Sequence, residues 1–201
     1  PLVVISGQVA SHLIGTDAFQ ETDMIGISRP IVKHSFLVQS AEEIPAIVKK
    51  AFHIASSGRP GPVVIDVPKD MTDPAIKFEY KYPKDLYLRS YPILGEADSL
   101  QVSEAVKLLK AANKPVIYAG GGVIQSDASE ELVSLSKMTG APVTNTLMGL
   151  GAYPATDDQF IGMLGMHGTY EANMVMSEAD LIFNVAARFD DRITNNPKKF
   201  G

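Results

Sequence analysis

The chain has 201 residues, and 18 basic against 23 acidic side chains give it a formal net charge of −5. Apolar residues make up 45% and charged residues 20%, which is typical of a folded globular protein and excludes an intrinsically disordered one. The absence of cysteine excludes disulfides, thiolate metal sites and cysteine nucleophiles within these residues. No basic cluster suits a nucleic-acid backbone, and no apolar run reaches the roughly 18 residues of a membrane span. We expect a cytoplasmic protein that binds neither nucleic acid nor membranes.

The first part of the chain reads as an amphipathic helix between two buried strands. Residues 1–5 form an apolar run that predicts a strand inside a sheet, with room for other strands of that sheet to precede it in the chain. Apolar residues recur at helical spacing through residues 42–55, which predicts a helix with Ser40 as N-cap and Glu43 as its capping-box partner. The β-branched run at 61–68 predicts a second strand. Because the chain opens directly in a strand without a methionine, we expect it to be a piece of a longer polypeptide.

Residues 71–98 differ from the rest of the chain and read as a linker. They contain three prolines, four tyrosines and scattered charges, and no helical or strand period is sustained through them. Beyond them helices and strands alternate with short connections. The predicted helices are 99–112 with Ser99 as its cap, 128–139 and 169–178, and the predicted strands are 115–119, 141–146 and 180–186. This alternation predicts an α/β fold whose parallel sheets carry helices on both faces.

Glycine-rich and charged segments follow the predicted strands of the second half. Ligands of open parallel sheets bind where the strands end, and here those ends are 120–122, 146–149 and 187–192. Glycine lets a ligand approach the backbone, but a tight strand-to-helix turn explains a glycine triplet equally well. The dinucleotide fingerprint fails because Gln125 stands where glycine or alanine is required, and no Gly-Lys-Ser/Thr sequence supports a P-loop.

The segment 188–192 (RFDDR) carries the strongest local indication of a binding site. Its two arginines offer planar forks for carboxylate or phosphate, and its two aspartates can accept from ribose hydroxyls or hold the arginines in place. The alternative is a cluster of ion pairs that satisfy one another.

Other residues give weaker indications of a binding site. His167 lies alone between glycines, and no histidine spacing predicts a metal site. Met166 in the same loop either packs in the core or faces a flat ring. Asp66 and Lys69 form either a structural pair or, for the lysine, a cation at the mouth of a pocket.

Eight motifs together resemble a known enzyme family. In chain order they are 6–9 (SGQV), 14–21 (IGTDAFQE), 57–63 (SGRPGPV), 66–70 (DVPKD), 120–122 (GGG), 147–151 (LMGLG), 162–170 (GMLGMHGTY) and 188–192 (RFDDR). Over essentially all 201 residues the chain resembles the catalytic large subunit of acetohydroxyacid synthase (acetolactate synthase), most like the bacterial isozyme III type.

The resemblance implies an enzyme that condenses pyruvate with pyruvate or 2-ketobutyrate with loss of CO2, in the synthesis of branched-chain amino acids. It implies that residues 1–75 are the end of a pyrimidine-binding domain, 76–98 a linker, and 99–201 most of a Rossmann-like central FAD-binding domain. Thiamine diphosphate and Mg²⁺ would be held by parts outside this chain, so we expect this piece alone to be inactive. A homodimer or homotetramer and a small regulatory subunit are the implied partners.

The resemblance also assigns residues. The implied FAD contacts are Arg59, Gly120, Gly121, Gly122, Thr146, Leu147, Met148, Leu164, Gly165, Met166, His167, Gly168, Arg188, Asp190 and Arg192. The implied catalytic residues are Gln20, Lys69 and Arg192, the last holding the carboxylate of the second ketoacid, while Phe19, Gln20, Lys69 and Met166 line the substrate channel.

The chain departs from the family pattern at Ala10, where many members carry proline, and at Ala186-Ala187, where they often carry Gly-Val. Two other interpretations remain open at this point. One is a different thiamine-diphosphate enzyme, of the pyruvate oxidase or glyoxylate carboligase type. The other is a nucleotide-binding regulatory module that needs no further domain.

Overall fold

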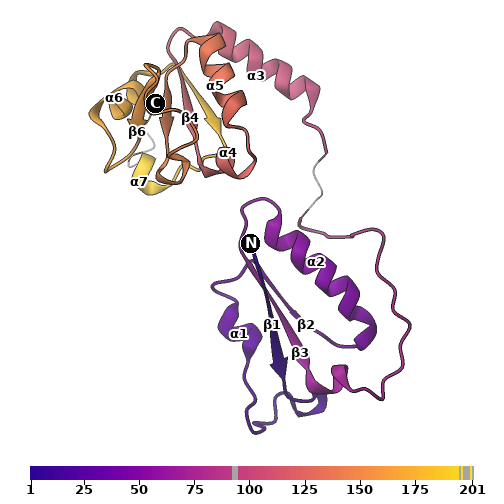
Figure 1. Cartoon of the computed structure of the whole chain (residues 1–201). Helices are drawn as coiled ribbons and strands as arrows, with labels where there is room; N and C mark the ends of the chain where they lie inside the picture. Colours follow the sequence, from indigo (N-terminus) through magenta and orange to yellow (C-terminus); the bar gives the residue numbers. More distant parts are fainter. Residues whose placement is uncertain (92–94, 195, 197–199, 201) are drawn as a thin grey trace. The chain divides into compact units, whose positions relative to one another are not determined.

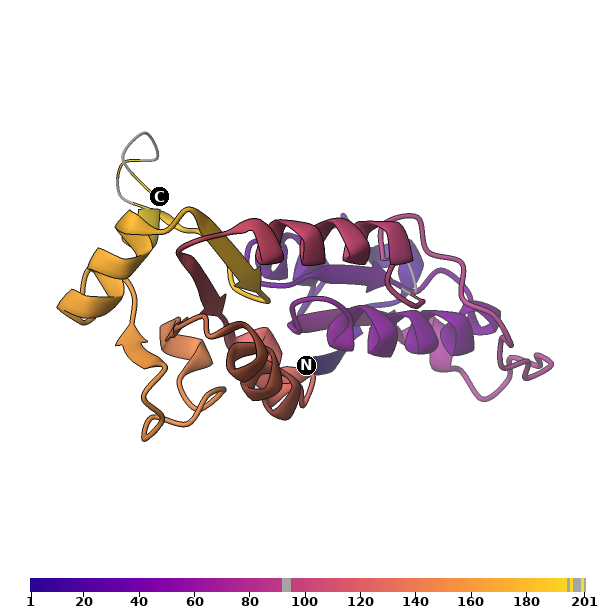
Figure 2. The same cartoon turned by 90° about the horizontal axis from the view of Figure 1, so that it is seen from above.

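The computed structural model describes residues 1–91, 95–194, 196 and 200. The chain divides into two compact units, residues 1–94 and 95–201, and each has its own parallel sheet and its own core (Figures 1 and 2). The α/β fold with parallel sheets is therefore confirmed. None of the described helices is long and apolar enough to cross a membrane.

The first unit is a three-stranded parallel sheet in the order β1-β3-β2. Its elements are β1 (Leu2–Gln8), α1 (Met24–Ser28), β2 (His34–Leu37), α2 (Ile44–Ser56) and β3 (Pro62–Pro68), with short 3-10 helices at Ser11–Leu13, Ala41–Glu43 and Lys69–Thr72. The apolar face of α2 packs on the sheet, where Ala51 and Ile54 contact the cluster around Val63 and Ile65. This burial of aliphatic side chains is the main stabilising contribution in the unit.

One expectation for this unit was wrong. The predicted capping box does not form, because Ser40 starts a 3-10 turn and makes no side-chain cap bond, and α2 begins beyond it. The opening strand was expected inside a sheet with room for other strands to precede it in the chain, and this stays a prediction. Among the described residues β1 pairs with β3, and Leu2 and Ile5 are 58% and 69% exposed. The four-residue strand β2 was not predicted, since it is too short to show a period.

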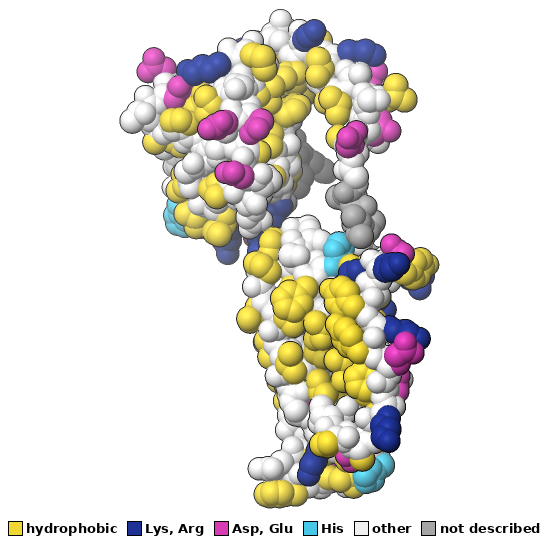
Figure 3. Space-filling model, turned by 45° about the vertical axis from the view of Figure 1, so that its right-hand side comes forward, with side chains coloured by type: hydrophobic (Ala, Val, Ile, Leu, Met, Phe, Trp, Pro, Cys, Tyr) yellow, Lys and Arg dark blue, Asp and Glu magenta, His cyan; other side chains and the backbone are white. Residues whose placement is uncertain are grey.

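The segment after Thr72 has no helix or strand in its described residues up to Asp98, and it runs along α2. The Lys49 ammonium donates to the carbonyls of Pro83 at 2.6 Å and Lys84 at 2.8 Å, and Nε2 of His53 lies 3.2 Å from the Tyr91 carbonyl. Tyr80, Tyr82 and Tyr87 of this segment stay exposed. Figure 3 shows that hydrophobic side chains gather on one face of the first unit. The segment is therefore attached to the first unit by contacts of its own, rather than crossing open solvent.

The second unit is a four-stranded parallel sheet in the order β6-β5-β4-β7. Its elements are α3 (Ser99–Ala111), β4 (Pro115–Ala119), α4 (Gly121–Gln125), α5 (Ser129–Thr139), β5 (Val143–Asn145), β6 (Phe160–Met163), α6 (Tyr170–Glu178), β7 (Leu181–Val185) and α7 (Asp191–Thr194). Side chains of β4 alternate between two cores. Ile117 and Ala119 pack against α4 and α5, whereas Val116 and Tyr118 pack against α6 and α7.

The structure differs from the sequence predictions here at one helix cap and in three short elements. The cap of α3 is Asp98 and not Ser99, since the Asp98 carboxylate accepts from the backbone N–H groups of Leu100 and Gln101, both at 2.9 Å. The strand β6 falls where a connection was expected. The helices α4 and α7, of five and four residues, were not predicted because they are too short to show a helical period.

A left-handed residue that is not glycine ends β7. Ala186 has φ of 50°, a conformation that costs an L-residue about 1–2 kcal/mol. Replacing it with glycine removes this strain but adds backbone entropy to the unfolded chain. We expect Ala186→Gly to raise the free energy of unfolding in urea by about 0.5–1 kcal/mol. The neighbouring Ala187→Gly, where φ is not positive, should lower it by a similar amount, and equal losses in both variants would contradict the assignment of strain.

Asp180 ties the turn before β4 to the start of β7. Its carboxylate accepts from the backbone N–H groups of Asn113 at 2.7 Å and Lys114 at 2.8 Å, and these bonds hold its pKa below the ordinary value of 3.8. A lowered pKa stabilises the fold above the unfolded-state pKa, and that contribution is lost as pH falls through the folded-state pKa. We expect Asp180→Asn to lower Tm at pH 7, and the difference to shrink as pH falls below 3.8 and to vanish once pH is below the folded-state pKa. Asp127→Asn, which removes a carboxylate elsewhere in the second unit, is the control for the change of charge.

Candidate functional site

The described strands of the second unit are parallel, so their carboxyl ends meet at one edge of the sheet. We call this the strand-end edge. It is formed by the segments 120–122 after β4, 146–149 after β5, 164–168 after β6 and 186–192 after β7. The structure thus brings together nearly all the residues for which the resemblance implies FAD contacts, although they come from four separate stretches of sequence.

The glycines of this edge are required by the approach of one chain segment to another. A Cβ on Gly120 would collide with the carbonyl of Ala186, and one on Gly121 would lie 2.9 Å from the carbonyl oxygen of Met148. A Cβ on Gly149 would lie 2.5 Å from the carbonyl oxygen of Ala119. These contacts explain the triplet as a tight turn, which is one of the two explanations that the sequence left open. The close approach of the backbones also brings three loops together, and these loops form the candidate site.

The segment after β6 combines a buried anchor with an exposed tip. Leu164 is buried, and its N–H donates to the carbonyl of Asn145 at 3.1 Å. The Asn173 side chain on α6 holds Gly165 from both sides, accepting from its N–H at 3.3 Å and donating to its carbonyl at 3.1 Å. Met166 and His167, which follow these two anchored residues, are exposed. The anchors fix the loop, so Met166 and His167 stand at the edge in a defined place.

The charged segment after β7 pairs within itself. The Arg188 guanidinium lies 3.3 Å from the Asp190 carboxylate, and the Arg192 guanidinium lies 3.7 Å from the Asp191 carboxylate. The Asp190 carboxylate also accepts a hydrogen bond from the backbone N–H of Arg192 at 3.1 Å. Both arginine side chains remain 71% exposed, and ion pairs in water contribute little. The cluster of ion pairs is therefore present, but it leaves both guanidinium groups available to an anion.

Two buried polar atoms near this edge have no hydrogen-bond partner in the described part of the chain, the Tyr118 hydroxyl and Oδ1 of Asn145. Burial, with the nearby negative charge of Asp190, raises the pKa of Tyr118 to about 12, so the phenol is neutral at physiological pH. The Tyr118 ring contacts Phe189 at a centroid distance of 5.4 Å. A buried carbonyl oxygen such as that of Asn145 accepts readily from a donor that arrives with a ligand. Sequence reasoning missed both residues, although a polar residue inside a buried strand was a signal.

Exposed apolar side chains lie beside the charged ones at the strand-end edge. Leu147, Met148 and Met166 are 70%, 75% and 63% exposed, which is unusual for three large apolar side chains on neighbouring loops. Together with the guanidinium groups and the Asp190 carboxylate, this set suits a ligand that has a flat apolar ring, anionic phosphates and hydroxyls. The residues therefore fit a flavin nucleotide.

The predicted residues of the first unit fall at two ends of its sheet. Phe19 and Gln20 lie in the loop after β1, and Lys69 follows β3, so the three lie at the carboxyl edge. Phe19 is 89% exposed, and Gln20 has φ of 65°. Arg59 instead precedes β3 and lies at the opposite end of that strand. Met166 belongs to the second unit, and the predicted channel stays a prediction.

The suggested pair of Asp66 and Lys69 does not form. Asp66 is buried and accepts from the Gln8 amide at 3.1 Å, whereas Lys69 is exposed and makes no ion pair with the described residues. The reason is that successive β3 positions alternate in direction and the chain turns after Pro68. No group of three or more histidine, aspartate or glutamate side chains suited to a metal ion occurs among the described residues.

Comparison with known proteins agrees with this geometry. Residues 102–201 match the family described as thiamine pyrophosphate enzyme, central domain. The whole chain is similar to acetolactate synthase large subunits, with 57% identity to that of Haemophilus influenzae, 60% to that of Buchnera aphidicola from Acyrthosiphon pisum, and 56% to the isozyme 3 large subunit of Escherichia coli K12. In each case the alignment covers 100% of this chain and 35% of the relative, so the chain spans about a third of their length.

Identity at this level over every residue of the chain includes both units and the segment between them, and it accounts for the order of the eight motifs along the sequence. Residues 102–201 thus match the central domain of thiamine pyrophosphate enzymes, and the whole chain is similar to about a third of acetolactate synthase large subunits.

Proposed function

We propose that this chain is part of the large subunit of an acetolactate synthase. The whole enzyme would join two 2-ketoacids: pyruvate loses CO2, and the remaining two-carbon unit forms a carbon–carbon bond to pyruvate or 2-ketobutyrate. The observation that carries the proposal is the 56–60% identity to such large subunits over the entire chain. We assign residues 1–75 to the end of the pyrimidine-binding domain, 76–98 to a linker and 99–201 to the central domain.

The strand-end edge is the proposed FAD site. Arg188 and Arg192 would donate to the phosphates, Asp190 would accept from a hydroxyl, and Met148 and Met166 would cover the apolar ring. The remaining proposed contacts are Arg59, Gly120, Gly121, Gly122, Thr146, Leu147, Leu164, Gly165, His167 and Gly168. The condensation needs no net oxidation, so FAD would have a structural role. Thiamine diphosphate, with Mg²⁺ bound outside this chain, would supply the carbanion chemistry.

The substrate would meet residues of both units. Gln20 and Lys69 would contact the reacting ketoacids, Phe19 and Met166 would exclude water from the channel, and the Arg192 fork would bind the carboxylate of the second ketoacid. Thiamine diphosphate bound between subunits calls for a homodimer or homotetramer, and a small regulatory subunit is the further proposed partner.

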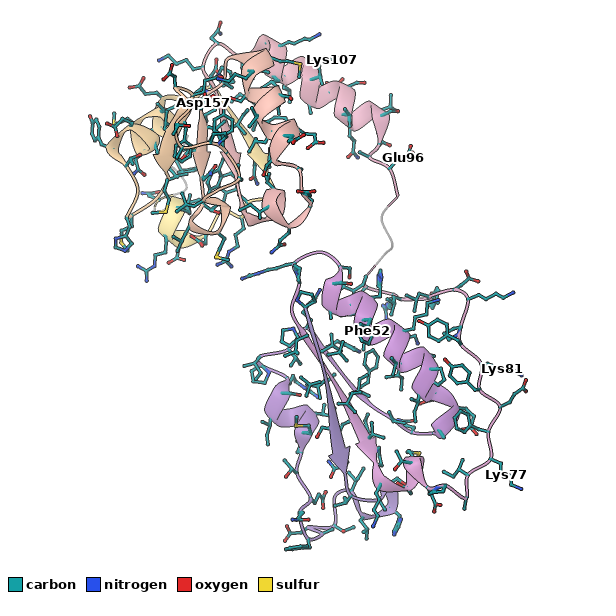
Figure 4. All side chains as sticks on the ribbon, viewed as in Figure 1. Phe52, Lys77, Lys81, Glu96, Lys107 and Asp157 are labelled. Atoms are coloured by element: carbon teal, nitrogen blue, oxygen red, sulfur yellow. The ribbon has the colours of Figure 1, made fainter. Side chains whose placement is uncertain are left out.

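Binding of FAD by this chain tests the proposed site directly. We expect FAD fluorescence to be quenched saturably, with Arg188→Ala weakening binding about tenfold or more because a charge-assisted hydrogen bond is lost. Lys107→Ala is the matched control, since it removes one exposed positive charge on α3 (Figure 4) without touching the strand-end edge. Binding of NAD in place of FAD, or equal weakening in both variants, would contradict the site.

The proposed activity is tested in the full-length protein by measuring the rate at which acetolactate forms. With FAD saturating, we expect Arg192→Ala to lower kcat/KM for pyruvate about 10- to 100-fold, the range given by losing a hydrogen bond to a charged group. Lys107→Ala should leave it unchanged. Wild-type rates in the Arg192 variant would show that the carboxylate is bound elsewhere.

A further inference from the structure

The loop of residues 9–22, between β1 and α1, is held in a strained shape. Asp17 and Gln20 both have left-handed backbones, with φ of 61° and 65°. Such conformations persist in residues other than glycine only when surrounding contacts enforce them. The Glu21 carboxylate holds the loop in this conformation from within by accepting hydrogen bonds from the backbone N–H groups of Gly15 and Ala18. These hydrogen bonds lower the pKa of Glu21.

Gln8 joins the two ends of this loop to each other and to the sheet. Its side-chain carbonyl accepts from the Val9 N–H at 2.9 Å, at the start of the loop. Its amide nitrogen donates to the Thr22 carbonyl at 2.6 Å, at the end of the loop, and to Asp66 on β3 at 3.1 Å. Only one orientation of the amide satisfies these three groups, because Val9 can only donate and the other two accept. Asp70 holds Ser11 separately, and so fixes only the first part of the loop.

Asp66 lies beneath this amide in a place where a carboxylate is unfavourable. It is 1% exposed, it pairs in register with Ser6 on β1 and Leu37 on β2, and its Oδ1 has no partner in the described part of the chain. Burial, together with the negative charge of Asp23, raises the pKa of Asp66, while hydrogen bonds from Gln8 and Ser6 act in the opposite direction. A raised pKa means that stability is lost as pH rises through it, so at neutral pH this carboxylate does not serve the stability of the sheet.

We propose that Asp66 and Gln8 are positioning residues, which hold the turn carrying Phe19 and Gln20 in one place above the carboxyl edge of the first sheet. Asp66 fixes the orientation of the Gln8 amide, and Gln8 fixes both ends of the loop. The expected effect on catalysis rests on the proposed function, in which that turn faces the ketoacid substrate. The expected effect on the order of the loop does not depend on the proposed function.

The order of the loop can be measured in this chain without reference to activity. The chain contains no tryptophan and Phe19 is 89% exposed, so Phe19→Trp places a single fluorescent reporter on the turn. We expect Asp66→Leu and Gln8→Ala each to lower the fluorescence anisotropy of that tryptophan. Asp66→Asn should preserve it, because the asparagine carbonyl can still accept from Gln8.

Measuring Tm distinguishes a positioning role of Asp66 from a purely structural one. Since the buried charge is unfavourable, Asp66→Asn and Asp66→Leu should leave Tm at pH 7 unchanged or raised. The matched control is Ile65→Val, a buried neighbour on β3 whose change lowers Tm without touching the loop. If anisotropy stays unchanged in both Asp66→Leu and Gln8→Ala, or falls only in proportion to Tm as in the control, the proposal is overturned. Gln8→Ala, at a half-buried residue, keeps the test valid if Asp66→Leu does not fold.

The catalytic consequence is measured in the full-length protein with Phe19 intact. We expect Asp66→Leu to lower kcat about tenfold with a smaller effect on KM, and Asp66→Asn to restore most of the rate. An unchanged kcat in a variant whose loop has lost its order overturns the catalytic part of the proposal. A wild-type protein that forms no acetolactate overturns the proposed function instead and leaves the loop result standing.

Discussion

The strand-end edge of the second unit depends on close approach of backbone to backbone. Side chains at Gly120, Gly121 and Gly149 would occupy space that already holds the backbone of neighbouring strand ends. With glycine there, the segments after β4, β5 and β7 come together, and these segments carry the exposed Met148, Arg188 and Arg192. Glycine therefore acts here through the chain's own packing, and the chemistry toward a ligand comes from the side chains around it.

The loops at the carboxyl ends of the strands are held in place by different contacts in the two units. In the second unit, loops at the sheet edge are fixed by backbone contacts and by the amide of Asn173. In the first unit the loop after β1 is long, and it is held by carboxylates, with Glu21 inside it and Asp66 beneath it. A loop that keeps Gln20 in a left-handed conformation needs such contacts, because the strained backbone would otherwise relax.

The sequence was sufficient for the fold class and for most long elements, because both depend on patterns within one segment. The strand β4 was predicted with its observed bounds, and α3, α5 and α6 to within a residue or two. What it missed depends on contacts between segments or on elements shorter than one period. The cap of α3 at Asp98 and the strand β6 are examples.

The candidate site shows the same division. Motifs identified the residues of the strand-end edge, yet the polar atoms of Tyr118 and Asn145 could be recognised only from burial and the absence of a partner among the described residues. Asp66 is the clearest case. In sequence it was an acidic residue near Lys69, and a pair between them was reasonable, but the pleat of β3 turns it inward toward Gln8. The contacts of Asp66 lead through the Gln8 amide to both ends of the loop that carries Phe19 and Gln20, and these contacts are visible only in the structure.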